Sequence, residues 1–400
     1  MRLLKIGVYY PAYLTQFYAS RSDLTSCSYA VQHAALMHDC FGSSDFWTTA
    51  LSRLGYETCE LVANAEPLQK AWASEHGIEN DNRDWLFEIT TAQVKAFRPE
   101  VLLVADYSTF TAGYLKRLKE ECPSLRLILG WCGAPYNDPE VFKEWDVVLS
   151  CIPELVAHFQ QHGHLSHHVN HAFDPRILDR IELDKAPNVD FAFIGSVLKQ
   201  NRFHVAREEI LLHLIEHTNL QIWSDLKQSL AVERRALSPR RLVNDVIRAT
   251  RSIGVRTAHR QSPPSSDGRV DARIVERALA PLFGLEMFQQ LRDSRVALNT
   301  HIDISPVSAS NMRLFEATGV GVCLITDWKE NLPQLFEPDA EVLTYRHAEE
   351  CAEKVTYILD HEDVRRTLAA AGQRRALRDH NFDVRAVQID QIIRGALTRH

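Results

Sequence analysis

The strongest constraint on how this chain folds is a regular alternation of short apolar runs with amphipathic helical patterns. In the first half, the apolar runs lie at residues 3–10, 57–62, 101–105, 125–129 and 147–151. Strands that alternate with helices pair in parallel and carry helices on both faces of their sheet. Such a sheet binds its ligands at the carboxyl ends of the strands. The first half therefore predicts an α/β domain with Rossmann-like topology.

The same pattern starts again after a polar stretch at residues 174–190. Strands are predicted at 191–195, 295–300 and 322–326, and helices at 205–217, 311–318, 364–378 and 384–397. We predict two Rossmann-like domains that face each other across a cleft, the first over residues 1–175 and the second over residues 188–380. The last helix, within residues 381–400, follows the final strand. We expect it to cross back and pack on the first domain.

Composition and charge exclude several classes of protein. Hydrophobic residues make up 45% of the 400 positions, which is enough for two buried cores and excludes a disordered chain. The formal net charge of −7 argues against nucleic acid as a partner of the whole chain. Eight cysteines are scattered without a C-x-x-C pair, and no apolar stretch is long enough to span a membrane. A cytoplasmic location is therefore expected.

Residues 234–277 differ from the rest of the second domain and are predicted to be an insert. They contain eleven Arg and no Lys, against four acidic residues. One interpretation is a solvated helix surface, which such segments usually form. The other is contact with an anionic partner, either a phosphorylated substrate or the surface of a membrane.

The most informative stretch for function is SASNMRLFEATGVGVCLITD at residues 308–327. Ser310 is expected to cap a short helix whose free backbone N–H groups suit a phosphate. Arg313 and Glu316 lie three residues apart and share one helical face, which suits either a ligand with a diphosphate and ribose hydroxyls or a plain salt bridge. Gly319 is expected to end the helix in the left-handed conformation, and Gly321 to permit close packing before the next strand.

The run NMRLFEATGVGVCLITD, together with LPQLFEPDAEVLTYRHAEECAEKVTYIL and AAAGQRRALRDHNFDVR, resembles the carboxy-terminal donor domain of glycosyltransferases with the GT-B fold. The sequence looks closest to the CgeB-like, spore-maturation type and is more distantly similar to the large retaining family four. The resemblance covers roughly residues 190–390. It implies an enzyme whose second domain holds a nucleoside-diphosphate sugar while the first domain holds the acceptor.

The resemblance also implies which residues bind the donor. They are Gly195, Ser196, Arg202 and Arg313 near the diphosphate, Asn299, His301 and Asn311 beside the sugar, and Glu316 at the ribose. Many members of family four carry a second Glu eight residues before the ribose Glu, and here that position is Ser308. The stereochemical outcome is therefore open, and His301 or Asp303 is implied to hold the sugar instead.

No metal ion and no cofactor other than the donor are expected. In glycosyl transfer the leaving nucleoside diphosphate gains negative charge, which Arg side chains and helix amino ends stabilise. GT-B enzymes usually achieve this without a metal, and the chain has no D-x-D motif. Histidines cluster at positions 162, 164, 167, 168 and 171, but their spacing is not specific for a metal site.

The first domain is expected to supply a base that activates the acceptor. Asp45 lies at the start of the helix predicted at 46–54, where inverting GT-B enzymes often place their base, and a favourable interaction with the helix dipole is the alternative. Asp106 follows the strand at 101–105 and is the second candidate, with a role in the turn as its alternative. His171 precedes AFDP, similar to a His-x-x-Asp-Pro segment that the family places beside the interdomain cleft, and a hinge role is its alternative.

The sequence therefore predicts a metal-independent glycosyltransferase with a glycan, a lipid-linked molecule or a small molecule as acceptor. The alternative is a non-catalytic GT-B scaffold or a protein that binds sugars or nucleotides. A dinucleotide-dependent oxidoreductase is disfavoured, because YYPAYL follows the first strand where G-x-G-x-x-G is needed. Aromatic residues between Tyr9 and Tyr29 either stack on an acceptor ring or form a small satellite core.

Overall fold

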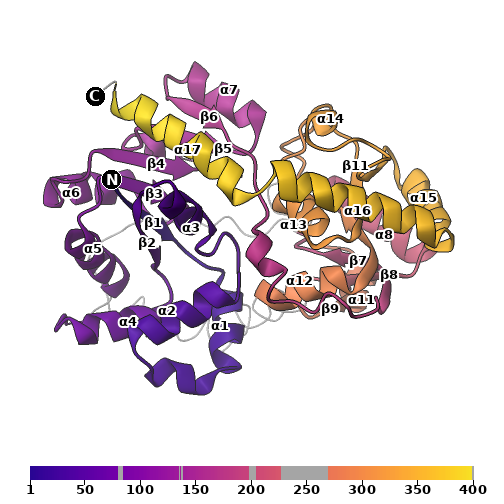
Figure 1. Cartoon of the computed structure of the whole chain (residues 1–400), viewed down its shortest axis with the longest axis horizontal. Helices are drawn as coiled ribbons and strands as arrows, with labels where there is room; N and C mark the ends of the chain where they lie inside the picture. The colour runs from indigo at the N-terminus through magenta and orange to yellow at the C-terminus, as the bar shows by residue number, and fades with distance from the viewer. Residues whose placement is uncertain (80–83, 135, 137, 198–203, 227–268, 399–400) are drawn as a thin grey trace, which may run out of the picture.

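Two parallel sheets, each of six strands, lie side by side in this computed structural model (Figure 1). The structure describes residues 1–79, 84–134, 136, 138–197, 204–226 and 269–398. The predicted α/β architecture with two Rossmann-like units is confirmed. Most of the Arg-rich segment 234–277 lies outside the described residues, as does Arg202.

The first sheet has the strand order β2-β1-β3-β4-β5-β6. Its strands are β1 (Arg2–Gly7), β2 (Glu57–Val62), β3 (Val101–Val104), β4 (Leu127–Trp131), β5 (Val147–Ser150) and β6 (Ser166–His168). Its helices are α1 (Pro11–Ala19), α2 (Tyr29–His38), α3 (Phe46–Arg53), α4 (Glu66–Glu75), α5 (Trp85–Phe97), α6 (Ala112–Glu121) and α7 (Pro153–Gln161), with 3₁₀ turns at Ser22–Ser26, Pro139–Phe142 and Pro175–Ile177.

The second sheet has the order β12-β11-β10-β7-β8-β9. Its strands are β7 (Val189–Ile194), β8 (Leu220–Trp223), β9 (Ala278–Leu279), β10 (Ser294–Asn299), β11 (Cys323–Asp327) and β12 (Leu343–Tyr345). The helices that follow Asp190 are α8 (Val205–His217), α11 (Ala272–Arg277), α12 (Gly284–Arg292), α13 (Met312–Val320), α14 (Leu332–Leu335), α15 (Ala348–Asp360), α16 (Glu362–Asp379) and α17 (Phe382–Leu397).

Both faces of each sheet are buried, as the alternation of side chains along a strand requires. In the first sheet Leu3 and Leu103 pack toward α3 and α17, whereas Leu4 and Leu102 join the core on the opposite face. The core cluster on the α3 face continues into the second unit through Phe173, which contacts α12 and α13. The two units therefore share one apolar contact region, which includes Phe173 of the segment that connects them.

The last helix crosses back to the first unit, as the sequence analysis expects. In Figure 1, α16 lies along the second sheet and α17 continues from it over α3. Trp47 and Phe46 of α3 meet Phe382 at ring distances of 5.0 and 5.1 Å, and Tyr56 donates a hydrogen bond to Asp390 (2.6 Å). The chain thus passes between the units twice, near residues 170–188 and again near residue 381.

Three local predictions were wrong. The strand predicted at 3–10 ends at Gly7, because Pro11 begins a helix. Gly319 lies inside α13, and it is Gly321 that ends this helix with a left-handed φ of 79°. Ser310 does not cap α13, since Asn311 occupies the N-cap position and the Ser310 hydroxyl donates to Ser305.

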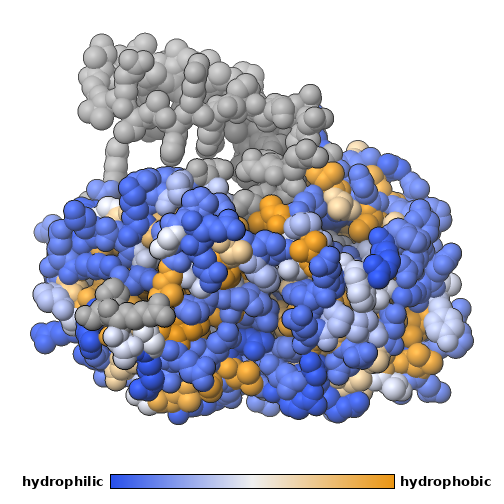
Figure 2. Space-filling model, turned by 90° about the horizontal axis from the view of Figure 1, so that it is seen from above, coloured by the Kyte–Doolittle hydropathy of each residue, from blue (hydrophilic) through white to orange (hydrophobic). Residues whose placement is uncertain are grey.

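None of the helices within the described ranges is long and apolar enough to cross a membrane. On the face shown in Figure 2, hydrophobic side chains of the described residues lie in small separate groups among hydrophilic ones.

Candidate functional site

The carboxyl ends of β7 and β10 meet around a buried guanidinium group, that of Arg207 in α8. Its Nε donates to Thr300 Oγ1 (2.7 Å), Nη2 to the Thr300 carbonyl (2.8 Å) and Nη1 to the Ser196 carbonyl (2.6 Å). Burial lowers the pKa of Arg207 to about 10; the charges of Asp327 and Asp303 oppose this shift, and that of Arg313 adds to it. The Thr300 carbonyl also accepts from Asn311, two residues before Arg313, so the two arginines approach one edge of the sheet from separate helices.

Two amide side chains hold the start of α13 against β10. Asn311, the N-cap residue, donates to Asn299 Oδ1 (2.5 Å) and to the Thr300 carbonyl (3.2 Å). Asn299 donates in return to Asn311 Oδ1 (3.2 Å) and to Thr326 Oγ1 (2.9 Å). These bonds fix the first turn of α13, whose free N–H groups and positive dipole end lie at the strand ends. Asn299 and Asn311 thus position the helix and donate to each other.

His301 and Asp327 form a second polar pair at this edge. Asp327 Oδ1 accepts from the His301 backbone N–H (3.0 Å) and from Nδ1 (2.7 Å), and Lys329 lies 3.3 Å from Oδ2. Burial raises the pKa of Asp327, but His301 and Lys329 outweigh it and bring the value to about 2. The other ring nitrogen, His301 Nε2, is buried without a hydrogen-bond partner among the described residues. Asp303 lies nearby and accepts from the Val205 N–H at the start of α8 (2.7 Å).

The salt bridge that the spacing of Arg313 and Glu316 predicts is present. Arg313 Nη1 lies 2.9 Å from Glu316 Oε2 and 2.9 Å from the sulfur of Met287. Glu316 is buried, which raises the pKa of its carboxyl group against the opposing effect of Arg313. Met287 belongs to α12, which follows Phe283, so the pair lies beside the part of the second unit that meets Phe41 of the first. The carboxylate and the guanidinium neutralise each other at this place.

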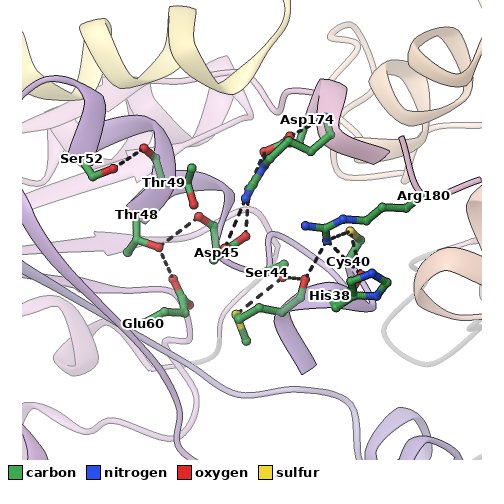
Figure 3. Close-up of polar contacts among 12 residues, drawn as sticks. His38, Cys40, Ser44, Asp45, Thr48, Thr49, Ser52, Glu60, Asp174 and Arg180 are labelled. Carbon is green, nitrogen blue, oxygen red and sulfur yellow. Dashed lines mark hydrogen bonds and ion pairs between the residues drawn. The ribbon is translucent and has the colours of Figure 1, made fainter. Parts of the chain in front are cut away.

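Asp45, the first candidate for the acceptor base, binds an arginine from the segment between the units (Figure 3). It is the N-cap residue of α3, yet its side chain makes no capping hydrogen bond. Arg176 Nη2 lies 2.9 Å from Asp45 Oδ1 and 2.8 Å from Asp174 Oδ2. Neighbouring Arg180 donates to the His38 carbonyl (3.0 Å) and to Cys40 Sγ (3.0 Å). These contacts attach the connecting segment to the first unit.

The other two base candidates lie apart from Asp45. Asp106 accepts hydrogen bonds from Ser108 Oγ (2.8 Å) and the Thr109 backbone N–H (2.8 Å), so it closes the turn after β3. The His171 ring packs with its centre 5.2 Å from that of Trp131, and it makes no hydrogen bond to the described part of the chain. Burial and then the charge of Arg385 lower the pKa of His171 to about 4, so the ring is neutral at pH 7. His171 lies two residues before Phe173, which pairs with Asn381 where both connecting segments pass between the units.

The remaining predicted residues, which are Gly195, Ser196 and Arg202, lie either near Arg207 or outside the described ranges. Gly195 and Ser196 directly follow β7, and Gly195 donates its N–H to the Trp223 carbonyl (3.1 Å). Arg202 lies outside the described residues. No group of three or more His, Cys, Asp or Glu side chains is arranged to hold a metal ion within the described ranges.

Sequence reasoning missed two residues at this edge, Arg207 and Asp327. Arg207 precedes Leu211 and Leu214 by four and seven residues, so it belongs to the buried face of the predicted helix 205–217. A cation on an apolar helical face is a detectable signal for a buried binding group. Asp327 directly follows the apolar run 322–326, where a carboxylate lies at a strand end.

Residues 234–391 match the family described as glycosyl transferase-like. No curated protein sequence gives a match. Among solved structures, sucrose-phosphate synthase from Thermosynechococcus elongatus is similar at 12% identity, with a TM-score of 0.53 and 100% of both chains covered. HepE from Anabaena in complex with UDP-glucose is similar at 10% identity (TM-score 0.54; 99% of this chain and 100% of that chain).

AviGT4, a glycosyltransferase involved in avilamycin A biosynthesis, is similar at 11% identity, with a TM-score of 0.53 and coverage of 100% of this chain and 99% of that chain. These similarities extend over the whole length of both units and agree with the two parallel sheets. The protein therefore has the two-unit GT-B fold of glycosyltransferases, and the residues that match the glycosyl transferase-like family, 234–391, lie in its second half.

Proposed function

We propose that this protein is a glycosyltransferase that moves a sugar from a nucleoside-diphosphate sugar to an acceptor hydroxyl. The GT-B fold and the match over residues 234–391 support the class of reaction. One observation carries the donor assignment: the Thr300 carbonyl accepts from both Arg207 and Asn311, so the Arg207 guanidinium lies beside the amino end of α13, the helix that carries Arg313. Guanidinium groups at the amino end of a helix suit a diphosphate anion.

The diphosphate of the donor is proposed to lie between these two guanidinium groups. In the described contacts, each terminal nitrogen of Arg207 uses one of its two N–H groups. As the bond between the anomeric carbon and the diphosphate breaks, negative charge grows on the leaving group. Fixed cations and backbone N–H groups then gain interaction energy in the transition state, which speeds the reaction.

Glu316 is proposed to hold the ribose of the nucleotide. Its carboxylate lies 2.9 Å from Arg313, so a donor replaces one ion pair with two contacts: ribose hydroxyls on Glu316 and phosphate on Arg313. We propose that His301, whose Nε2 is buried and unpartnered within the described residues, hydrogen-bonds the sugar. This role takes the place of the second Glu that Ser308 replaces.

No metal ion and no further cofactor enter this proposal. Arg207, Arg313 and the amino end of α13 supply the positive charge that a metal would otherwise bring to the diphosphate. The test is activity after treatment with EDTA, which should equal that of the untreated protein.

The group that activates the acceptor is proposed to be one of Asp45, Asp106 and His171. Asp45 binds Arg176 and Asp106 closes its own turn, so either carboxylate must give up protein donors to reach an acceptor hydroxyl. His171 is neutral at pH 7 and has a ring free of hydrogen bonds to the described residues, which favours it on contacts alone. Substitution of each by a residue with an amide side chain (Asp45→Asn, Asp106→Asn, His171→Gln) distinguishes them, since loss of the base lowers turnover by about a hundredfold or more.

A non-catalytic nucleotide-binding scaffold is the second candidate. It is favoured by the fact that both Glu316 and Asp45 already have arginine partners. The acceptor is proposed to be a glycan, a lipid-linked molecule or a small molecule. The proposal includes a cytoplasmic location and, through the Arg-rich residues 234–277, peripheral contact with an anionic membrane.

A screen of nucleotides and nucleotide sugars tests the proposal. UDP, GDP, dTDP and CMP and their sugars are added separately, and the melting temperature and slow hydrolysis of each sugar donor are measured. Stabilisation by at least one nucleoside diphosphate together with hydrolysis of its sugar supports the enzyme. Stabilisation without any hydrolysis or transfer supports the scaffold, and no response to any of them contradicts both.

A further inference from the structure

Tyr10 is a large aromatic residue left exposed beside a buried aromatic cluster. Its side chain is 65% exposed, whereas Tyr9, Tyr13 and Phe17 are buried in the satellite core of the first unit. The satellite core therefore uses the neighbouring rings but leaves Tyr10 outside. Its ring is therefore available to contact a ligand.

The backbone around Tyr10 is firmly held. Asn64 Oδ1 accepts from the Tyr9 N–H (2.8 Å), and Asn64 Nδ2 donates to the Tyr9 carbonyl (2.7 Å). Pro11 starts α1, and the Tyr10 carbonyl accepts the first helical bond from the Leu14 N–H (3.0 Å). Tyr10 is thus presented at a fixed place at the carboxyl end of β1.

That place adjoins the contact between the two units. The Tyr10 ring meets Phe41 edge-on at 5.5 Å, and Phe41 in turn meets Phe283 of the second unit at 5.7 Å. Directly after Phe283, a Cβ on Gly284 would lie 2.2 Å from Asp39 Oδ2, so the backbones of the two units approach closely here. Tyr10 therefore lies at the solvent-exposed edge of an aromatic cluster to which both units contribute residues.

The aromatic cluster beside Tyr10 leads to Arg313, because Met287 lies one turn after Phe283 in α12 and its sulfur lies 2.9 Å from Arg313 Nη1. Crowding by protein atoms, followed by the charges of Asp225 and Glu316, raises the pKa of Tyr10. Asp225 follows β8, and Glu316 belongs to α13, so both lie at the edge of the second sheet that carries Arg207. Tyr10 is therefore an exposed ring at the contact between the units, near the helix that holds Met287 against Arg313.

We propose that Tyr10 is a nucleotide-binding residue whose ring covers the nucleoside of the bound nucleotide from the side of the first unit. This inference rests on the proposed function. Glu316 holds the ribose, and the Tyr10 ring lies over the nucleoside on the opposite side, with its hydroxyl toward the ribose hydroxyls. An aromatic ring contacts any nucleoside through its flat face, which adds affinity without a fixed hydrogen-bond pattern.

The test compares nucleotide binding in the full-length protein and in two variants, Tyr10→Ala and Tyr10→Phe. The probe is whichever of UDP, GDP and dTDP binds the parent protein most tightly, measured by calorimetry without an acceptor. We expect Tyr10→Ala to weaken binding about tenfold and Tyr10→Phe about two- to threefold, since the ring supplies most of the contact. Inorganic pyrophosphate, which lacks a nucleoside, should bind the parent and Tyr10→Ala equally.

Tyr357→Ala is the matched control, because Tyr357 is 54% exposed on α15 of the second unit. It should leave nucleotide binding unchanged. Equal affinity of the parent and Tyr10→Ala for the nucleotide would overturn the inference while leaving the proposed function in place. A parent protein that binds none of the three nucleotides would overturn the proposed function and the inference together. Melting curves of both variants show that each is folded, and Tyr10→Phe keeps the comparison decisive if Tyr10→Ala unfolds.

Discussion

Arg176 binds both carboxylate oxygens of Asp45, through Nη2 at 2.9 Å and Nη1 at 3.3 Å. The arginine belongs to the segment between the two sheets, and the aspartate lies at the amino end of α3. About a quarter of each side chain is exposed, so solvent screens the pair only in part. The contact therefore fixes the connecting segment to the first unit.

We expect Asp45→Asn to act mainly on stability, because it removes the charge that Arg176 binds. The free energy of unfolding should fall by about 1–2 kcal/mol, measured by urea denaturation. Asp383→Asn is the control, since Asp383 pairs with Arg53 in a far more exposed ion pair and should change stability by less than about 0.5 kcal/mol. A drop in turnover of a hundredfold with unchanged stability would instead identify Asp45 as the base.

Lys5 and Glu60 form the most deeply buried ion pair among those described, at 2.5 Å, with both side chains 3% exposed. Lys5→Met alone leaves the buried Glu60 carboxyl, and Glu60→Leu alone leaves the buried Lys5 ammonium, without its charged partner, so each should lower the free energy of unfolding by about 3–5 kcal/mol. The double variant Lys5→Met with Glu60→Leu removes both charges and should recover most of that loss. Denaturation of the three variants checks this, and additive losses in the double variant would show that the two charges do not depend on each other.

His380 should make the protein less stable in mild acid. Its Nε2 donates to the Leu335 carbonyl (2.7 Å), and its Nδ1 accepts from Arg385 (2.8 Å), so neither nitrogen has room for a further proton. Burial lowers the pKa of His380 to about 4, against 6.5 for an unperturbed imidazole. Between these two values the unfolded chain binds a proton that the folded chain does not.

The contribution of His380 is therefore complete above pH 6.5 and is lost as the pH falls toward 4, by roughly 2–3 kcal/mol. His380→Gln keeps a donor and an acceptor but does not titrate, so the fall in stability between pH 7 and pH 4 should shrink. His38→Gln, at an exposed position, should leave it as in the parent. An unchanged pH dependence in His380→Gln would refute this origin of the acid sensitivity.

Gly319 is required for the packing of α13 on Phe173, in the segment that connects the two units. A Cβ at this position would lie 2.2 Å from Phe173 Cγ, which is far inside van der Waals contact. Gly319→Ala should destabilise the protein by about 2–3 kcal/mol, because the Phe173 ring has to move. Gly395→Ala, in α17 with nothing within 4 Å, should stabilise the protein by about 0.5–1 kcal/mol, and thermal melts of both variants compare the two effects.

Local sequence patterns predicted the bounds of several helices and strands correctly. The strand at 57–62 and the helix at 205–217 begin and end as predicted. The first strand was overextended because Val8–Tyr10 are apolar, although Asn64 and Pro11 turn the chain there. The sequence analysis assigned the helix end to Gly319 and the close packing to Gly321, whereas the structure shows the reverse. The close packing of Gly319 is a contact with Phe173, which is distant in sequence and which local spacing cannot predict.

The candidate site could be predicted in outline only. The resemblance pointed to Arg313 and Glu316, but their mutual ion pair is a property of the folded surroundings. Arg207 and Asp327 belong to segments distant in sequence that parallel pairing brings to one edge of the sheet. The binding roles of these residues stay predictions until a nucleotide is tested.

The most direct test of the central claim is calorimetry of a nucleoside diphosphate and of the corresponding monophosphate. The nucleoside is the one whose diphosphate binds the parent protein most tightly. Both ligands are measured on the parent, Arg313→Gln and Glu316→Gln. The account predicts that the parent binds the diphosphate at least about tenfold more tightly than the monophosphate. Arg313→Gln should remove most of this difference, Glu316→Gln should weaken both ligands about equally, and Glu353→Gln on the exposed face of α15 should change neither. Equal binding of both ligands by the parent, or diphosphate affinity unaffected by Arg313→Gln and Glu316→Gln, would contradict the account.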